Sequence, residues 1–153
     1  MIKCQQVCGN CTELFGHVNV DLLYQGQSSI EGFGLFTKVA IAPNRMIVPF
    51  TGMVGKPKSA GANVSDMLYL DVQKWITPKG VHRNVNHSCN PNATFIKWIR
   101  GEKDVVSIVA LKRVAKHAEI TVNYGAHHDF STGHQLCNCG DANCVTIVKH
   151  KQG

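Results

Sequence analysis

Cysteine is the residue type in this chain that most directly indicates chemistry, because seven cysteines stand in two tight groups and one isolated position. They are Cys4, Cys8, Cys11, Cys89, Cys137, Cys139 and Cys144. The count is odd, and the first residues, MIKCQQVCGNC, lack the apolar core of an export signal, so we expect thiolate–metal bonds rather than disulfides. Structural zinc takes four ligands, and the last group alone offers three.

Three further segments combine residue types that could serve a reaction. They are Gly32–Phe36 (GFGLF), Arg83–Asn92 (RNVNHSCNPN) and Glu119–Gly125 (EITVNYG). Each is ambiguous by itself. A lone G-x-G usually forms a tight turn, and the Asn, Ser and Pro of NHSCNPN suit loop geometry. The EITVNY run fits any half-buried strand whose tyrosine fills the core.

The elements that must position these segments are predicted to be short strands. From Tyr24 onward, apolar runs of roughly four to eight residues, rich in Val, Ile, Thr and aromatics, alternate with turn residues. Residues 101–104 (GEKD) predict a hairpin turn between ATFIKWI and VVSIVAL. Helical periodicity is weak. The 153 residues fit one domain, which we predict to be mainly β, built of several short sheets.

Composition and charge exclude several classes of protein. A hydrophobic share of 44% with 17% charged residues excludes a disordered or collagen-like chain. No apolar run approaches the ~20 residues that cross a bilayer, so we expect a soluble, intracellular protein without membrane contact. Sixteen Lys and Arg against ten Asp and Glu favour an anionic partner, nucleic acid first. The basic residues are scattered, apart from a small basic tail at 149–151.

In this order and spacing, the segments GFGLF, RNVNHSCNPN, EITVNYG and CNCGDANC resemble the SET-domain protein-lysine methyltransferases. The resemblance runs from about residue 24 to residue 145. It implies a fold of several short curved sheets with few short helices, in which the C-terminal segment threads beneath an earlier loop in a knot-like way. NHSC and EITVNYG would then lie side by side. The implied organisation is an N-terminal flank (1–22), a SET domain (23–130), a post-SET zinc-binding segment (131–148) and a basic tail (149–153).

The resemblance also implies a fourth ligand for the C-terminal cysteines. Cys89 with Cys137, Cys139 and Cys144 resembles the family's post-SET zinc site, which would hold a short polar tail in place. The alternative is that Cys89 is a small buried apolar residue. Cys4, Cys8 and Cys11 could form a second zinc site with His17. The family's preceding region normally has more cysteines, so free or pairwise-reactive thiols are the alternative there.

By the same resemblance, the cofactor is S-adenosylmethionine. The implied cofactor-binding residues are Gly32, Phe33, Gly34, Arg83, Asn86, His87 and Tyr124. Asn86 would bind the methionine portion, and the backbone at His87 the adenine. His82, His127, His128 and His134 are interpreted as ordinary surface or supporting residues.

Tyr124 matches the family's catalytic tyrosine. The reaction implied is transfer of a methyl group from a sulfonium to a neutral lysine amine, although free lysine has a pKa near 10.4. No carboxylate in the motifs is expected to take the proton. Desolvation and the sulfonium charge disfavour the ammonium form, and alignment supplies much of the rest. The phenol of Tyr124 would orient the methyl group and the amine.

The substrate channel of this family is aromatic-walled, which suits a methylated ammonium. Phe50, Tyr69, Phe95 and Val122 match positions on its wall. Phe95 and Val122 match two positions that set the degree of methylation, and neither carries a hydroxyl. We therefore expect dimethyl or trimethyl lysine as the product.

The leading hypothesis is a protein-lysine methyltransferase that acts on a histone or histone-like tail, located in the nucleus if the source is eukaryotic. One alternative is a catalytically inactive SET-fold binding module. Another is a basic, zinc-containing nucleic-acid-binding module, which leaves NHSCNPN and EITVNYG unexplained. A contact with nucleosomal DNA is a further possibility that no motif indicates, and the oligomeric state is open.

Overall fold

The computed structural model describes residues 2–3, 18–50, 52–55, 68–71, 74–78, 80–100, 103–124 and 137–144. The predicted second zinc site of Cys4, Cys8, Cys11 and His17 and the basic tail at 149–153 lie outside these residues. Within them the chain is mostly β, and its helices are two short 3-10 turns, η1 (Val20–Leu22) and η3 (Val81–Asn84). None of the described helices is long and apolar enough to cross a membrane.

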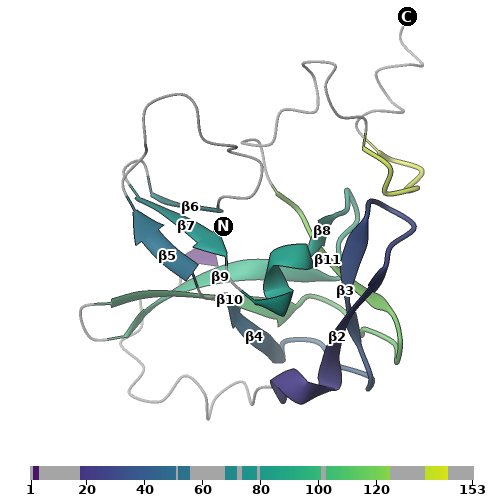
Figure 1. Ribbon diagram of the computed structural model, residues 1–153, viewed down its shortest axis with the longest axis horizontal. Helices are drawn as coiled ribbons and strands as arrows, with labels where there is room; N and C mark the ends of the chain where they lie inside the picture. The colour runs from purple at the N-terminus through teal and green to yellow at the C-terminus, as the bar shows by residue number, and fades with distance from the viewer. Residues whose placement is uncertain are drawn as a thin grey trace, which may run out of the picture.

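The strands form three small sheets (Figure 1). The first contains β1 (Ile2–Lys3), β9 (Ala93–Arg100), β10 (Lys103–Ala110) and β4 (Met46–Phe50), in that order. The second contains β2 (Leu23–Gln27), β3 (Phe33–Thr37), β11 (Glu119–Val122) and β8 (Asn86–His87). The third contains β5 (Gly52–Gly55), β7 (Lys74–Pro78) and β6 (Leu68–Asp71). The predicted mainly β architecture is therefore confirmed.

The hairpin predicted around residues 101–104 is confirmed, but the predicted turn is too long, because Lys103 and Asp104 already pair in β10. β9 and β10 pair antiparallel from Arg100↔Lys103 to Ala93↔Ala110. Both strands are rich in β-branched residues, which pack well on a pleated surface. β10 also pairs antiparallel with β4, so that the apolar run of β4 lies along its other edge.

The hydrophobic core joins the three sheets. One cluster of buried side chains includes Leu35 from β3, Ile108 from β10 and Ile76 from β7. Leu35, Ile47, Ile108 and Ile120 are fully buried, and burial of such a side chain stabilises the fold by about 1.5–3 kcal/mol. The core therefore holds the second sheet, which carries parts of three of the motifs on β3, β8 and β11, against the first.

Two loops pack against each other at the edge of this core. An isolated antiparallel bridge joins Ile41 to Val114, and the N–H of His117 donates to the carbonyl of Thr37 at 2.7 Å. Asn44 and His117 take positive φ angles of 62° and 63°, a region in which Asn and His are enriched among residues other than glycine. These turns fix where β4 begins and how the chain enters β11.

Candidate active site and thiol cluster

The NHSC segment and the EITVNY strand lie side by side, as predicted. β8 pairs in parallel with β11, with Asn86 opposite Thr121 and His87 opposite Val122. The N–H of Ser88 extends the pairing by donating to the carbonyl of Val122 at 2.9 Å. β8 is only two residues long, so few backbone hydrogen bonds hold the two segments together.

The hydroxyl of Tyr124 is anchored to the start of the NHSC segment. It donates to the backbone carbonyl of Val85 at 2.7 Å, and its ring packs against His87 with centroids 5.4 Å apart. The backbone N–H of Tyr124 donates to Nδ1 of His87 at 3.2 Å. Tyr124 is half-buried. Since its hydroxyl hydrogen is directed at Val85, the phenolic oxygen can accept a hydrogen bond from another group.

Glu119, which the sequence analysis gave no role, connects Asn86 to the loop before β3. Nδ2 of Asn86 donates to Oε1 of Glu119 at 2.8 Å, and it also lies 3.1 Å and 3.3 Å from the carbonyls of Glu31 and Phe33. The hydroxyl of Ser28 lies 2.9 Å from both oxygens of the same carboxylate. The sequence does contain a signal that could have indicated this role, because Glu119 is a charged residue at the start of an otherwise uncharged strand.

The two glycines of the G-x-G turn serve different purposes. Gly32 has a φ of +48°, in the left-handed region that favours glycine. Gly34 instead makes room for Glu119, because a Cβ added there would lie 2.7 Å from Cδ and 3.1 Å from Cγ of that side chain. Phe33 between them is 56% exposed. That these residues contact a cofactor stays a prediction.

Asn92, the last residue of NHSCNPN, fastens the motif to β11. Its Nδ2 donates to the carbonyl of Glu119 at 2.8 Å, and its Oδ1 accepts from the N–H of Thr121 at 2.9 Å. The side-chain amide therefore pairs with β11 as the peptide group of a neighbouring strand would. Its backbone carbonyl accepts from the N–H of Leu111 at 2.8 Å. The sequence analysis missed this role because its partners are distant in the chain.

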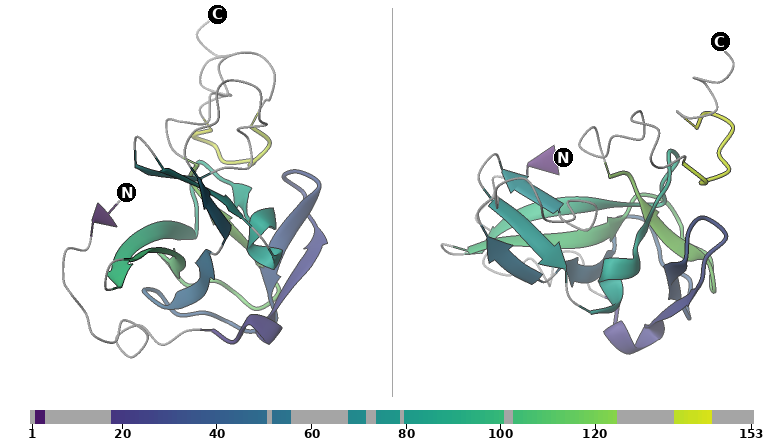
Figure 2. Two further views of the ribbon diagram at one scale, coloured as in Figure 1. Left: turned by 60° about the vertical axis from the view of Figure 1, so that its left-hand side comes forward. Right: turned by 45° about the horizontal axis from the view of Figure 1, so that its top comes forward.

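The four predicted zinc ligands come together in space. Their sulfur atoms, from Cys89, Cys137, Cys139 and Cys144, all lie within 4.8 Å of one another, and those of Cys89 and Cys137 are 3.9 Å apart. The Cys137–Cys144 segment lies at the same end of the molecule as the loop between β2 and β3 (Figure 2).

The arrangement of these sulfur atoms fits a tetrahedral zinc ion. Bonds of ~2.3 Å at tetrahedral angles place thiolates about 3.8 Å apart, close to the separation of Cys89 and Cys137. Burial raises the pKa of the Cys137 thiol well above its ordinary value, and hydrogen bonds with neighbouring thiols add to the shift. A bound cation reverses this preference by favouring the thiolate. Metal binding therefore displaces protons, and metal affinity is expected to fall as the pH falls.

The predicted channel residues are partly assembled. Phe50 and Phe95 are buried and in edge-to-face contact, with centroids 4.9 Å apart. Val122 is fully buried in β11, and Tyr69 lies in β6, which belongs to the third sheet. Arg83 is exposed on η3. Whether these residues line one channel stays a prediction.

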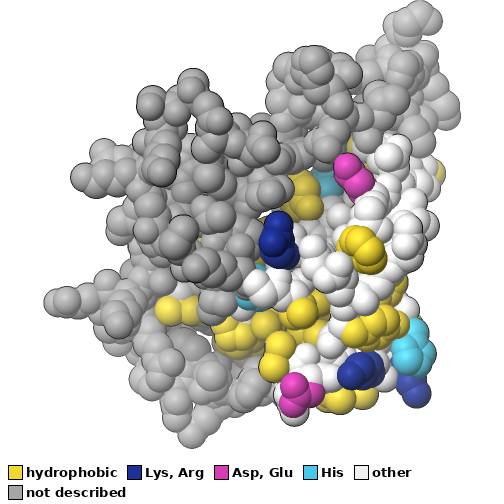
Figure 3. Space-filling model, in the orientation of Figure 1, with side chains coloured by type: hydrophobic (Ala, Val, Ile, Leu, Met, Phe, Trp, Pro, Cys, Tyr) yellow, Lys and Arg dark blue, Asp and Glu magenta, His cyan; other side chains and the backbone are white. Residues whose placement is uncertain are grey.

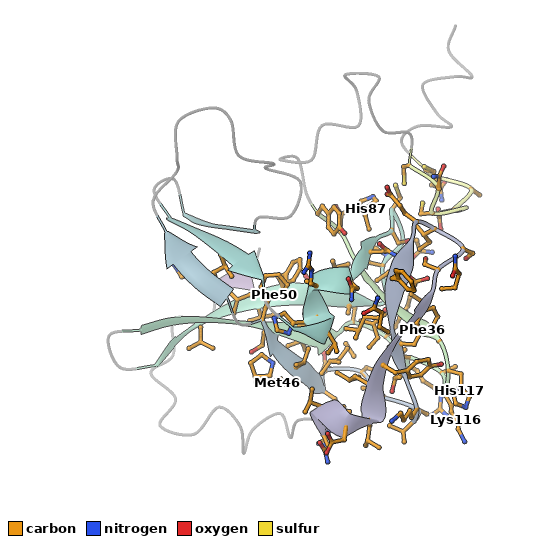
Figure 4. All side chains as sticks on the ribbon, in the orientation of Figure 1. Phe36, Met46, Phe50, His87, Lys116 and His117 are labelled. Atoms are coloured by element: carbon orange, nitrogen blue, oxygen red, sulfur yellow. The ribbon has the colours of Figure 1, made fainter. Side chains whose placement is uncertain are left out.

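His82 is a buried residue of this region. It is 5% exposed, and its ring lies 5.2 Å from that of Phe50 between centroids. Of the two interpretations of His82, a surface or a supporting residue, the structure therefore agrees with the second. Figure 4 shows Phe50 near the middle of the fold and His87 nearer the Cys137–Cys144 segment. The two histidines that are buried among the described residues, His82 and His87, therefore lie in different surroundings.

Residues 32–125 match the SET domain family. The chain is 30% identical over 148 residues to a protein of Cryptococcus neoformans var. neoformans named "Histone-lysine N-methyltransferase, H3 lysine-36 specific", covering 88% of this chain and 17% of that protein. Relatives with the same name from Debaryomyces hansenii and Candida albicans are 32% and 30% identical, over 78% and 82% of this chain and 18% and 16% of their own lengths. The chain thus spans less than a fifth of these relatives. With a family match that covers more than half of it, this chain belongs to the SET-domain family.

Proposed function

We propose that this chain is a protein-lysine N-methyltransferase that transfers a methyl group from S-adenosylmethionine to a lysine of a histone tail. The observation that carries this proposal is the parallel pairing of β8 with β11, which sets the Tyr124 hydroxyl against Val85 and the Asn86 amide against Glu119. The relatives named above are H3 lysine-36 specific. Lysine 36 of histone H3 is therefore the first target to test.

Bound S-adenosylmethionine supplies an electrophilic methyl group on a sulfonium. The neutral lysine amine would form its bond to this methyl carbon while the sulfur–carbon bond breaks, and the electron pair of that bond would stay on sulfur. The amine must first lose its ammonium proton to solvent. Because Tyr124 donates to Val85, its oxygen can accept an N–H from the amine and turn the lone pair toward the methyl group. Gly32–Gly34, Asn86 and the backbone at His87 are proposed to hold the cofactor beside it, with Arg83 in support.

A catalytically inactive binding module is the main competing function. It needs the fold but no oriented hydroxyl, whereas Tyr124 is held by its hydroxyl, its ring and its N–H together. A nucleic-acid-binding module needs neither the β8–β11 pairing nor the Glu119–Asn86 contact. These features favour the enzyme.

The function is tested by incubating the purified protein with core histones and isotope-labelled S-adenosylmethionine, followed by mass spectrometry of the products. A histone H3 in which arginine replaces lysine 36 is the matched substrate control. Label on H3 that disappears with this replacement supports both the activity and the target. Label that persists contradicts the target only. Stoichiometric cofactor binding without any labelled product favours the inactive module.

The zinc site is proposed to order the post-SET segment, 131–148, which carries three of its ligands. We expect about one zinc per chain from the tetrahedral cysteine site. Chelation should remove activity before the β core unfolds, because the cluster lies outside the hydrophobic core cluster of Leu35, Ile108 and Ile120. Elemental analysis measures the zinc content. Activity assays and circular dichroism recorded during chelation show whether activity is lost before the β structure. Less than half an equivalent of zinc in active protein would contradict this site, and about two equivalents would support the second site.

The degree of methylation is proposed to follow from the absence of hydroxyl groups at Phe95 and Val122. Phe95→Tyr adds a hydroxyl beside Phe50, which can hold a water in the space of a second methyl group. We expect the wild type to form dimethyl or trimethyl lysine, and the variant to shift toward monomethyl lysine while keeping turnover. Phe36→Tyr makes the same change on β3, where the ring stacks on Tyr24, and should leave the products unchanged.

Mass spectrometry of the product lysine decides between these outcomes. A wild type that stops at one methyl group on its best substrate would show that another residue fills the channel, with Phe50 or Tyr69 the next to test.

Contact with nucleosomal DNA is supported by charge alone. The joined loops 38–45 and 111–118 contain no Asp or Glu, and they expose Lys38, Arg45, Lys112, Arg113 and Lys116. Among the described residues on the face drawn in Figure 3, however, Lys and Arg side chains stand apart rather than in one continuous patch. DNA contact and a nuclear location therefore stay predictions that follow from the proposed histone substrate.

A further inference from the structure

The imidazole of His87 lies between Tyr124 and the thiol cluster. Its Nδ1 accepts the backbone N–H of Tyr124 at 3.2 Å, and its Nε2 lies 3.4 Å from Sγ of Cys89. The side chain is 8% exposed. Figure 4 shows it on the side of the β8–β11 pair that is nearer the Cys137–Cys144 segment. One buried ring therefore contacts both a proposed metal ligand and the residue proposed to orient the methyl group.

The hydrogen bonds determine which ring nitrogen carries the proton. A backbone N–H only donates, so Nδ1 of His87 must present its lone pair to Tyr124, and the proton of the neutral ring is on Nε2. That proton faces the sulfur of Cys89. A thiolate accepts a hydrogen bond more strongly than a thiol does, because the bond is then charge-assisted. The contact between Nε2 and sulfur is therefore strongest when Cys89 is a metal-bound thiolate.

We propose that His87 is a positioning residue that couples occupancy of the cysteine metal site to the backbone position of Tyr124. This inference rests on the proposed zinc site. With metal bound, the thiolate of Cys89 fixes the ring of His87, and the ring fixes the N–H of Tyr124. Since β8 contributes only two residues to the pairing with β11, the imidazole is a substantial part of what holds Tyr124 in register.

Two substitutions at His87 separate its two contacts. In His87→Asn, the side-chain oxygen can replace Nδ1 as the acceptor for Tyr124, but nothing replaces Nε2 toward sulfur. In His87→Gln, the longer amide can reach the sulfur as Nε2 does, but the acceptor for Tyr124 is displaced. His82→Asn is the matched control, since it removes a second histidine that is buried in the described part of the chain and that packs on Phe50 rather than on the cluster.

The test uses the full chain, and its main measurement is the ¹H–¹⁵N resonance of the Tyr124 amide with zinc bound and after chelation. We expect this resonance to move on chelation in the wild type and in His82→Asn, and to be nearly insensitive to chelation in His87→Asn. Zinc removal releases the cysteine segment in every variant, so release alone cannot produce this difference. Equal movement in the wild type and His87→Asn, or none in the wild type, would overturn the inference.

Cobalt(II) provides a second measurement that does not depend on activity. The thiolate-to-cobalt charge-transfer band should shift in His87→Asn, stay close to the wild-type position in His87→Gln, and not change in His82→Asn. Zinc affinity should fall ~10-fold in His87→Asn, as is typical when a partner of a metal ligand is removed. An unshifted band in His87→Asn would overturn the coupling while leaving the zinc site intact. Failure of the wild type to bind cobalt or zinc would instead overturn the site itself.

Discussion

Tyr124→Phe is expected to lower the rate of methyl transfer by ~100-fold or more, in the range found when one preorganised polar group is removed from an active site. The variant loses the oxygen that orients the amine, while its ring can still pack against His87. The affinity for S-adenosylmethionine should stay within a few-fold of the wild type. Loss of the 2.7 Å hydrogen bond to Val85 should reduce the free energy of unfolding by roughly 1 kcal/mol.

The matched control is Tyr24→Phe, which makes the same chemical change at the tyrosine whose hydroxyl faces Nδ1 of His117 at 3.4 Å. Tyr24 lies on β2, which pairs with the edge of β3 opposite to β11, so turnover should be unaffected. Single-turnover kinetics with saturating cofactor, together with calorimetric titration of the cofactor, separate the chemical step from binding. Wild-type turnover in Tyr124→Phe would mean that another group orients the amine.

The features that the sequence predicted correctly depend either on local pattern or on motif spacing. The β9–β10 hairpin follows from two runs of β-branched residues around a turn, and its register is confirmed from Arg100 to Ala93. The adjacency of Asn86 to Thr121 was not visible in any local pattern. It came from the resemblance of the NHSC and EITVNY motifs to a family in which they meet.

The features that the sequence did not predict depend on partners distant in the chain. Glu119 forms its hydrogen bonds with Ser28 and Asn86, 91 and 33 residues away. The side chain of Asn92 bonds to the backbone of β11 as a neighbouring strand would, and its two partners are 27 and 29 residues away in the chain. A polar residue of this kind looks like an ordinary loop or edge residue until its partner is known. The same is true of Gly34, which has no room for a side chain because the Glu119 side chain occupies the position of its Cβ.

The contact between Gly34 and Glu119 predicts the second large effect. In Glu119→Ala, the amide of Asn86 and the hydroxyl of Ser28 lose their shared acceptor, at a cost of roughly 1–3 kcal/mol. The loop before β3 is then tied less firmly to β8. Where this cost falls on the arrangement that binds S-adenosylmethionine, the affinity should fall by about 5- to 150-fold, the binding equivalent of 1–3 kcal/mol. Gly34→Ala should cause a similar loss, because its Cβ collides with the Glu119 side chain.

A double-mutant cycle distinguishes this collision from a general intolerance of side chains at the cofactor loop. Glu119→Ala removes the atoms that the new Cβ of Gly34→Ala would meet, so the double variant should lose clearly less cofactor affinity than the two single losses added together. Gly26→Ala, directly across the ladder from Gly34, is the control, since its Cβ meets the rings of Phe36 and Tyr24 rather than Glu119 and should change cofactor affinity little. Calorimetric titration of the wild type, the two single variants, the double variant and the control measures their affinities for the cofactor. Full additivity would mean that Gly34 is required by the cofactor itself, through close approach of the bound molecule to the backbone, and not by the carboxylate beneath it.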